Sequence, residues 1–201
     1  MPSNIQNFIS SLSFKGISKQ NRFDVIVTPP TLLGPVNPQL TYRAESASFP
    51  GRSINTIDDQ RDTVGPMRKI GYFSMYEAFS ITFVCNKDLE EKETLEKWMD
   101  LIVGTYRTSR SGLASGNFKA GYYNNYIGTI EVFQYDEQNN LTYKIKLLEA
   151  YPTSINTLET NWNSSDVHKI VGTFSYRYYQ YDDFRNPKPP RERPPSLSLI
   201  T

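Results

Sequence analysis

The chain has 201 residues and a formal net charge of +1, from 22 Lys and Arg against 21 Asp and Glu. This length fits one domain, or one domain with long arms, and it can bury a core without disulfides or a metal. The balanced charge excludes a basic surface that holds nucleic acid through phosphates, and it excludes a strongly acidic tail. The single cysteine excludes internal disulfides, and its alternating apolar surroundings predict that Cys85 is a small buried side chain.

The N-terminal residues predict an arm rather than a targeting signal. Residues 1–15 do not combine a cationic stretch with an apolar one, as a signal peptide does. Residues 1–20 are polar but contain scattered apolar side chains, among them Phe8 and Phe14. We therefore expect this segment to dock on its own domain or on a neighbour. No apolar run approaches the roughly 18 residues that a membrane helix needs, so no membrane association is expected.

Alternation of apolar and polar residues predicts the first strands. Residues 22–28 alternate until Pro29 ends the strand. Residues 40–47 alternate again, and the Phe49-Pro50-Gly51 sequence that follows is a turn signal. The 14 tyrosines and 11 phenylalanines of the chain suit strands and protein interfaces.

The next two segments differ in character. Residues 52–75 mix charged residues with β-formers, which predicts an exposed hairpin or a long loop. Residues 77–85 show the clearest alternation of the chain, with Phe79, Ile81 and Phe83 on one face. We therefore predict a half-buried strand there.

After that strand the period changes to that of a helix, over about residues 88–103. Asp88 and Glu91 have the spacing of a capping pair, and Gly104 is expected to end the helix. Four apolar residues form one helical stripe: Leu95, Trp98, Met99 and Ile102.

The second half of the chain predicts a loop and further strands. Residues 105–125 are rich in Gly, Ser, Tyr and Asn, which is typical of a loop. Residues 126–135 and 141–151 alternate as two long strands joined by a turn, and Pro152 is expected to break the second. A short strand is possible at 154–158.

The last strand is predicted at 168–181 and is apolar or aromatic on both faces. Such a strand belongs in a sandwich or barrel, or on a surface closed by a partner. Residues 186–195 contain five prolines, which favours an extended polyproline conformation outside the core. Leu197 and Leu199 could then seat on a neighbouring molecule.

Catalytic constellations are missing from the sequence. One histidine, His168, and one cysteine cannot form a zinc cluster, and His168 is expected to be structural. No phosphate loop, dinucleotide fingerprint or nucleophile elbow occurs. Asp58, Asp59 and Asp62 lack regular ligand spacing, so we interpret them as a solvated loop. Trp98 and Trp162 are expected as core or packing anchors.

Several segments follow one another in an order typical of one family. They are Asn21-Arg22-Phe23-Asp24-Val25, Glu45-Ser46-Ala47-Ser48-Phe49-Pro50-Gly51, Phe79 to Asn86 before the helix, Ile130 to Tyr135, Tyr151-Pro152-Thr153-Ser154-Ile155, Trp162, and Phe174-Ser175-Tyr176-Arg177-Tyr178. Over residues 21–181 this ordered set resembles the tail tube proteins of contractile-tailed phages of the T4-like type.

The resemblance implies a mainly β fold, an antiparallel sandwich or barrel with one flanking helix at about 88–103. It divides the chain into an N-terminal arm (1–20), a tail-tube-like domain (21–182) and a proline-rich tail (183–201). It also implies a structural virion protein rather than an enzyme, with no cofactor and no metal.

In function, the resemblance implies hexameric rings that stack into the inner tube of a contractile phage tail. The implied partners are further copies of the chain, the tail sheath protein, baseplate and tail terminator proteins, and DNA that passes through the lumen without sequence-specific binding. Assembly would take place in the host cytoplasm and the product would be part of the virion.

Two alternatives remain open at this point. The arms and residues 31–38 exceed what a minimal tube subunit needs, which leaves a baseplate tube initiator or a tail adaptor on the same fold. A β-sandwich hydrolase or binding module, motivated by Asp58, Asp59 and His168, belongs to a different class. The candidate subunit-interface residues are Phe8, Phe14, Asp59, Arg61, Arg68, Tyr72, Tyr176, Tyr178, Leu197 and Leu199.

Overall fold

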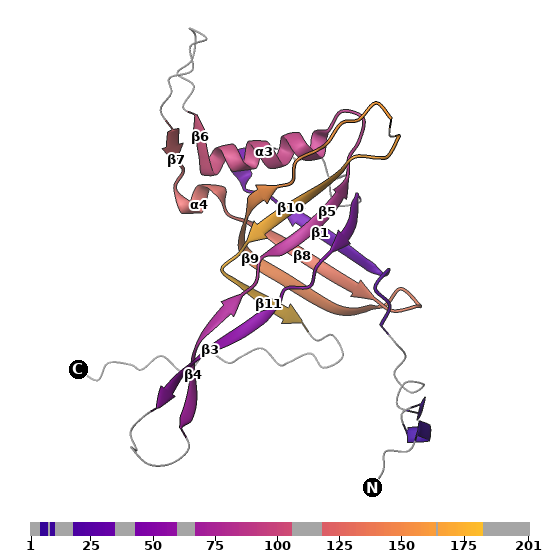
Figure 1. Cartoon of the computed structure of the whole chain (residues 1–201), viewed down its shortest axis with the longest axis vertical. Helices are drawn as coiled ribbons and strands as arrows, with labels where there is room; N and C mark the ends of the chain where they lie inside the picture. The colour runs from indigo at the N-terminus through magenta and orange to yellow at the C-terminus, as the bar shows by residue number, and fades with distance from the viewer. Residues whose placement is uncertain are drawn as a thin grey trace, which may run out of the picture.

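A computed structural model describes residues 5–7, 9–10, 18–34, 43–59, 67–105, 118–163 and 165–182 of the chain. Most of these residues form antiparallel strands, and a 13-residue helix flanks them (Figure 1). The strands are β1 (Phe23–Thr28), β2 (Ala44–Ala47), β3 (Arg52–Asp59), β4 (Arg68–Tyr76), β5 (Phe79–Val84), β6 (Val103–Thr105), β7 (Phe118–Ala120), β8 (Gly128–Tyr135), β9 (Leu141–Ile155), β10 (Lys169–Ser175) and β11 (Tyr178–Asp182). Residues 5–7 and 9–10 are helical, and the other helical segments are η1 (Thr31–Leu33), α3 (Glu90–Ile102) and α4 (Tyr123–Tyr126).

Strand β9 connects the two layers of the fold. Residues 141–150 pair with β8, and β8 pairs in turn with β1. On its other side β9 pairs first with β11, over residues 144–148, and then with β10, over residues 151–155. Strand β10 leads on to β5 and β2. We call the strands β1, β8, β9 and β11 sheet A, and the strands β2, β5, β10 and residues 151–155 sheet B.

The core lies between the two sheets, as their alternating burial requires. In sheet A, Val25 faces Val132 across the β1–β8 pair, and both are 1% exposed. In sheet B, Phe83 faces Ile170 across the β5–β10 pair, and both are fully buried. This alternation confirms the strands predicted at 22–28 and 77–85 and the antiparallel β fold class.

Helix α3 covers the core with Leu95 and Trp98, both fully buried. The ring of Trp98 lies 6.1 Å from that of Phe174, and its Nε1–H donates a hydrogen bond to the Tyr126 carbonyl at 2.6 Å. Trp98 is therefore the packing anchor that the sequence predicts, with its polar atom satisfied.

The start of α3 corrects the predicted capping pair. The helix begins at Glu90, and Leu89 before it has a φ of 53° with no side-chain cap. Asn86 caps it instead: its Oδ1 accepts from the Glu90 N–H at 3.0 Å, and its own N–H donates to the Glu91 carboxylate. The prediction for Asp88 was wrong because the loop that enters the helix places Asn86, not Asp88, beside the first free amides.

The end of α3 also differs from the prediction. The helix stops at Ile102, and the Val103 N–H donates to the Met99 carbonyl. Gly104 does not end the helix but lies in β6, which pairs with β7. The helix therefore ends before Gly104, because the residues from Val103 onward pair with β7, a strand within the predicted 105–125 loop. Residues 106–117 lie outside the described part.

Strand β9 passes through Pro152 instead of ending there. Proline lacks an N–H, but β8 no longer pairs with this part of β9, so Pro152 sits on an edge where that loss is tolerated. The register with β10 shifts beside it, between Thr173 and Phe174. Glu149 marks the same corner with a φ of 56°. The predicted strand at 154–158 is the end of β9.

The predicted single strand 168–181 is divided into β10 and β11 around Tyr176 and Arg177. The two strands pair with successive parts of β9 and belong to different layers. Arg177 at this corner donates to the Glu149 carboxylate at 2.9 Å, and the Tyr123 hydroxyl donates to the other oxygen at 2.9 Å. The change of layer explains why both faces of the segment are apolar.

Glu91 of α3 is paired with Arg43, the residue directly before β2. It is 1% exposed and forms an ion pair with Arg43. Burial alone would raise the pKa of its carboxyl, but hydrogen bonds from Asn86 and Arg43 hold that pKa below its ordinary value of 4.5. A group whose pKa is depressed on folding stabilises the protein above its unfolded pKa, and this contribution is lost as the pH falls through the folded pKa.

We therefore expect Glu91→Gln to lower the free energy of unfolding at pH 7 by about 1–3 kcal/mol. The variant should also lose less stability than the wild type between about pH 5 and pH 3. Urea unfolding at several pH values measures both effects. Glu96→Gln on the same helix is the control, because Glu96 is 56% exposed beside Lys92. Equal losses in the two variants would contradict the role of Glu91.

Candidate association surfaces

The β3–β4 hairpin projects beyond both sheets (Figure 1). Its strands pair with each other from Arg52 opposite Tyr76 to Asp59 opposite Arg68, with a bulge between Asn55 and Thr56. The sequence prediction of an exposed hairpin within residues 52–75 is therefore confirmed. Residues 60–66 at its tip lie outside the described part.

This hairpin exposes large apolar side chains on both faces. Tyr72 is 67% exposed. The other exposed members are Ile54, Ile57, Met67, Ile70, Phe73 and Met75. A hairpin in isolation is at best marginally stable in water, and contiguous exposed apolar surface marks a contact with another molecule.

The pairing register shows how these side chains are distributed. Ile57 lies opposite Ile70, and Asn55 lies opposite Phe73 on the same face of β3. Ile54 lies on the other face, where it covers Gly71: a Cβ at Gly71 would come within 2.9 Å of the Ile54 Cγ2 atom. We call Ile57, Ile70, Phe73 and Met75 the hairpin patch.

Near the tip of the hairpin, acidic side chains of β3 lie opposite basic side chains of β4. The register places Asp58 opposite Lys69 and Asp59 opposite Arg68. Cross-strand pairs of opposite sign stabilise a hairpin by about 0.2–1 kcal/mol each. Among the described residues no group of three His, Cys, Asp or Glu side chains could hold a metal ion. His168 is elsewhere, at the start of β10, so it forms no constellation with Asp58 and Asp59.

Sheet B presents a smooth outer face and two strand edges. Most of the outward residues of its strands are small and uncharged, among them Ser46, Ser80, Thr82, Ser154, Val171 and Thr173. At one end of the face Lys169 donates to Glu45 at 2.6 Å. Within the described residues, β2 and residues 151–155 each pair on one side only. These edges can accept further strands.

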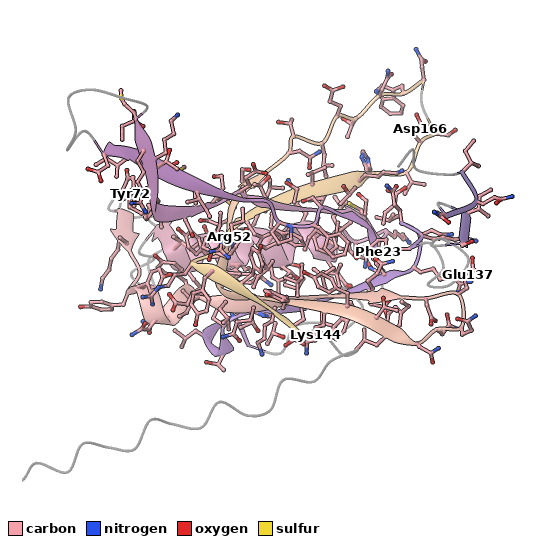
Figure 2. The ribbon with its side chains drawn as sticks, turned by 90° about the horizontal axis from the view of Figure 1, so that it is seen from below. Phe23, Arg52, Tyr72, Glu137, Lys144 and Asp166 are labelled. Atoms are coloured by element: carbon pink, nitrogen blue, oxygen red, sulfur yellow. The ribbon has the colours of Figure 1, made fainter. Side chains whose placement is uncertain are left out.

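The outer face of sheet A is charged, but its charges are paired. Glu131 lies 3.1 Å from Lys144 and 2.9 Å from Lys146. Lys144 also lies over the Phe133 ring, 4.9 Å from its centroid. Burial would raise the pKa of Glu131, but hydrogen bonds from the two lysines hold it below its ordinary value. Figure 2 shows Lys144 on the side of the molecule opposite Asp166.

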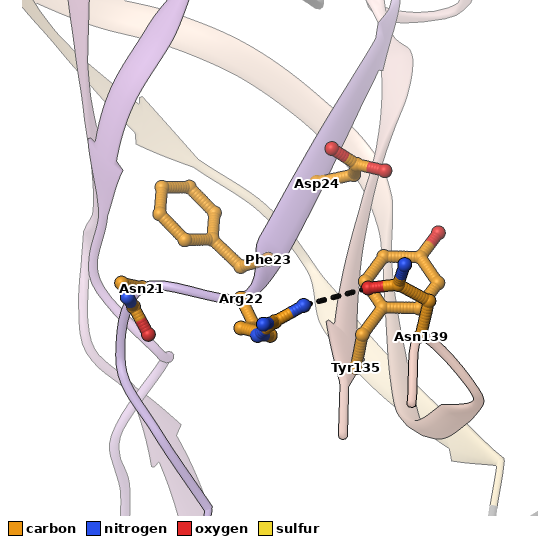
Figure 3. A pocket seen from close by; sticks show the side chains of 6 residues that line it. All are labelled: Asn21, Arg22, Phe23, Asp24, Tyr135 and Asn139. Carbon is orange, nitrogen blue, oxygen red and sulfur yellow. Dashed lines mark hydrogen bonds between the residues drawn. The ribbon is translucent and has the colours of Figure 1, made fainter. Parts of the chain in front are cut away.

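The segment before β1 is fixed to the turn between β8 and β9, around a hollow of about 520 Å³ (Figure 3). Arg22 donates to the Asn139 Oδ1 at 2.7 Å, and Lys19 forms an ion pair with Glu137 at 2.6 Å. The Gln134 amide donates to the Lys19 carbonyl at 2.7 Å. Asn139 has a φ of 61°, which asparagine tolerates. These contacts fix residues 19–22 against the turn between β8 and β9.

The predicted interface residues fall into three groups. Phe8, Phe14, Arg61, Leu197 and Leu199 lie outside the described residues. Asp59, Arg68 and Tyr72 all lie on the β3–β4 hairpin, which brings them together. Tyr176 and Tyr178 lie near the corner between the sheets.

The structure buries Tyr176 in the core, where it is 8% exposed. Its ring packs 5.9 Å from that of Tyr76, and burial raises the pKa of its hydroxyl to about 12. Among the described residues its hydroxyl has no hydrogen-bond partner. Tyr178 is half-buried in β11 opposite Leu148. A part in an interface remains a prediction for both tyrosines.

The structure contradicts the prediction that Trp162 is a core or packing anchor. It is fully exposed, in the loop 156–168 between β9 and β10. Hydrophobicity favours burial of tryptophan, but this loop lies beyond the end of sheet B at which Val84 pairs with Lys169. Cys85 is half-buried against the core, in keeping with a small apolar side chain. No helix within the described residues is both long and apolar enough to cross a membrane.

Together these features define a two-layer β subunit with surfaces suited to association. The phage tail tube protein family matches residues 18–182, and the chain belongs to this family. The resemblance found in the sequence is thereby confirmed. The family is one of structural tube proteins rather than enzymes.

Solved structures agree with this fold. A chain of the PVC sheath–tube complex, an extracellular contractile injection system in its extended state, is 16% identical with a TM-score of 0.58, covering 87% of this chain and 97% of that one. A chain of the six-fold-symmetrised anti-feeding prophage baseplate is 9% identical with a TM-score of 0.61, covering 84% and 97%. A chain of the PVC sheath/tube terminator is 16% identical with a TM-score of 0.58, covering 84% and 98%. No curated protein matches the chain.

The exposure of the hairpin predicts that its side chains contribute little to the fold of a single subunit. We expect Phe73→Ser, at a side chain 55% exposed, to change the free energy of unfolding by no more than about 0.5 kcal/mol. Phe83→Ala in the core should cost about 3–5 kcal/mol. Denaturant unfolding of dilute protein measures both. A comparable loss in Phe73→Ser would mean that the hairpin patch is packed within its own chain.

Proposed function

We propose that the chain is the repeating subunit of a tail tube, in which six copies close a ring and the rings stack. The observation that carries this proposal is the hairpin patch, an apolar surface that nothing in the described part of its own chain covers. Membership of the tail tube family supports the same function. The six-fold symmetry stated for the similar baseplate chain supports the number of copies.

Ring closure would use the two edges of sheet B. The strand order β2, β5, β10 and residues 151–155 is antiparallel at each step. An even number of alternating strands allows the β2 edge of one copy to pair in antiparallel fashion with the 151–155 edge of the next. Such pairing satisfies edges that otherwise invite aggregation, and it closes when the rotation fits.

In this arrangement the outer face of sheet B lines the lumen. Its small hydroxyl side chains and its paired Lys169 and Glu45 present a nearly neutral wall. Because affinity for DNA depends on unpaired Lys and Arg that neutralise phosphates, such a wall lets DNA pass without holding it. The lumen would therefore conduct DNA during ejection without sequence-specific binding.

The proposed partners follow from the same assembly. We expect a sheath protein around the tube and baseplate and terminator proteins at its ends, since the similar chains belong to a sheath–tube complex, a baseplate and a sheath/tube terminator. The assembled chain would be part of a phage tail or a related contractile particle, put together in the host cytoplasm.

A tube initiator or tail adaptor on the same fold is the second candidate. The similarity to a baseplate chain favours it. An initiator would form single rings that seed a tube, whereas a repeating subunit propagates by itself.

Negative-stain electron microscopy of the purified chain separates these functions. We expect hollow tubes many rings long. Single rings that do not extend would favour the initiator, and a stable monomer at high concentration would contradict both.

The proline-rich tail offers a further test of assembly. We propose that residues 186–201 contact neighbouring subunits, because a composition with five prolines favours an extended conformation and lowers the entropic cost of binding. Removal of 186–201 should shorten or abolish tubes while leaving the thermal midpoint of the dilute subunit within about 2 °C of the wild type. Tubes of normal length from the truncated chain would contradict a role for the tail.

A further inference from the structure

Trp162 lies midway along the sequence of the loop 156–168, and its whole side chain is exposed. The Asn163 N–H donates to the Asn161 Oδ1 at 3.0 Å, which forms a tight turn around Trp162. Tryptophan is highly buried on average, and where it is exposed it is the side chain most enriched among binding hot spots. The exposure of Trp162 therefore points to a contact with another molecule.

The base of this loop is held firmly by sheet B. The Asn156 Oδ1 accepts from the Val171 N–H at 2.7 Å, and the Cys85 N–H donates to the His168 carbonyl at 3.0 Å. Leu158 packs against the core. A loop fixed at both ends presents Trp162 with little further loss of conformational freedom on binding.

The loop and the hairpin lie at opposite ends of sheet B. Strand β5 begins at Phe79, directly after the hairpin, and ends at Val84. Strand β10 begins at Lys169, directly after the loop, and Lys169 pairs with Val84. Figure 2 shows the same separation, with Tyr72 of the hairpin and Asp166 of the loop at opposite ends of the molecule.

The two surfaces are complementary in chemistry. The loop offers a single large aromatic side chain, and the hairpin patch offers a broad apolar face. Their charges have opposite sign, since residues 156–168 carry Glu159 and Asp166 and a net charge of −2, whereas residues 52–76 carry a net charge of +1. Electrostatic attraction between surfaces of opposite net charge favours their association in the orientation that brings them together.

We propose that Trp162 of one copy docks on the hairpin patch of the next copy along the tube. Because the two surfaces differ and lie at opposite ends of the subunit, the contact is head-to-tail and can repeat without limit. The inference rests on the proposed function and assigns its axial contact, while the edges of sheet B close each ring.

Mixing two variants tests this docking directly. Trp162→Ser leaves the hairpin patch intact, and Phe73→Ser leaves the loop intact. We expect each variant alone to form rings but to need at least about tenfold more protein to form tubes. An equimolar mixture should form paired rings, since the hairpin patch of the Trp162→Ser ring can still receive Trp162 of the Phe73→Ser ring. Tyr122→Ser, at an exposed side chain outside both surfaces, is the control and should form tubes normally.

Acrylamide quenching of the wild-type chain gives an independent readout. Trp98 is buried in every state, so the accessible fluorescence comes from Trp162 and should become protected when tubes form.

The outcomes separate the docking from the proposed function. Tubes from Trp162→Ser at the wild-type concentration, or a mixture without paired rings, would overturn the docking alone. A wild-type chain that forms neither rings nor tubes would overturn the proposed function and the docking with it.

Discussion

The pairing of β9 with three strands is the interaction on which the rest of the structure depends. β8 holds one side of this strand, while β11 and then β10 hold the other, so one strand belongs to both sheets. This shared strand brings the alternating apolar faces of the two sheets together and allows α3 to seat Trp98 between them. The two sheets and α3 bury the core in this way, whereas the β3–β4 hairpin exposes a group of large apolar side chains.

The residues that stabilise the fold are therefore different from the residues that we expect to mediate association. The core side chains, such as Phe83 and Ile170, stabilise one subunit and face no partner. The hairpin patch and Trp162 contribute little to that subunit and lie at its two ends. A protein that leaves such surfaces exposed at both ends is suited to a polymer, in which every copy covers the next. A closed particle would require the same surfaces to meet around an axis.

The sequence predicted those elements whose signal is local. Alternation predicted β5, the mixture of charged residues and β-formers predicted an exposed hairpin or long loop, and the helical stripe predicted α3. The change of layer within β9 and the division at Tyr176 could not be predicted, since both depend on which distant strands pair with these residues. The prediction that Pro152 ends β9 was wrong, because a proline interrupts a strand only where a neighbouring strand would accept a hydrogen bond from the missing N–H, and β8 does not pair with this part of β9. The prediction that Trp162 packs in the core was wrong, because hydrophobicity favours burial of a side chain but does not tell whether the same chain or another molecule buries it.

Hydrogen exchange measured on the dilute subunit and on the assembled protein tests the central claim most directly, namely that other copies cover the hairpin. We expect amides of β3 and β4 to exchange rapidly in the subunit and to become strongly protected on assembly, while those of β5 are protected in both states. Hairpin amides that exchange at the same rate in the subunit and in the assembly would contradict it.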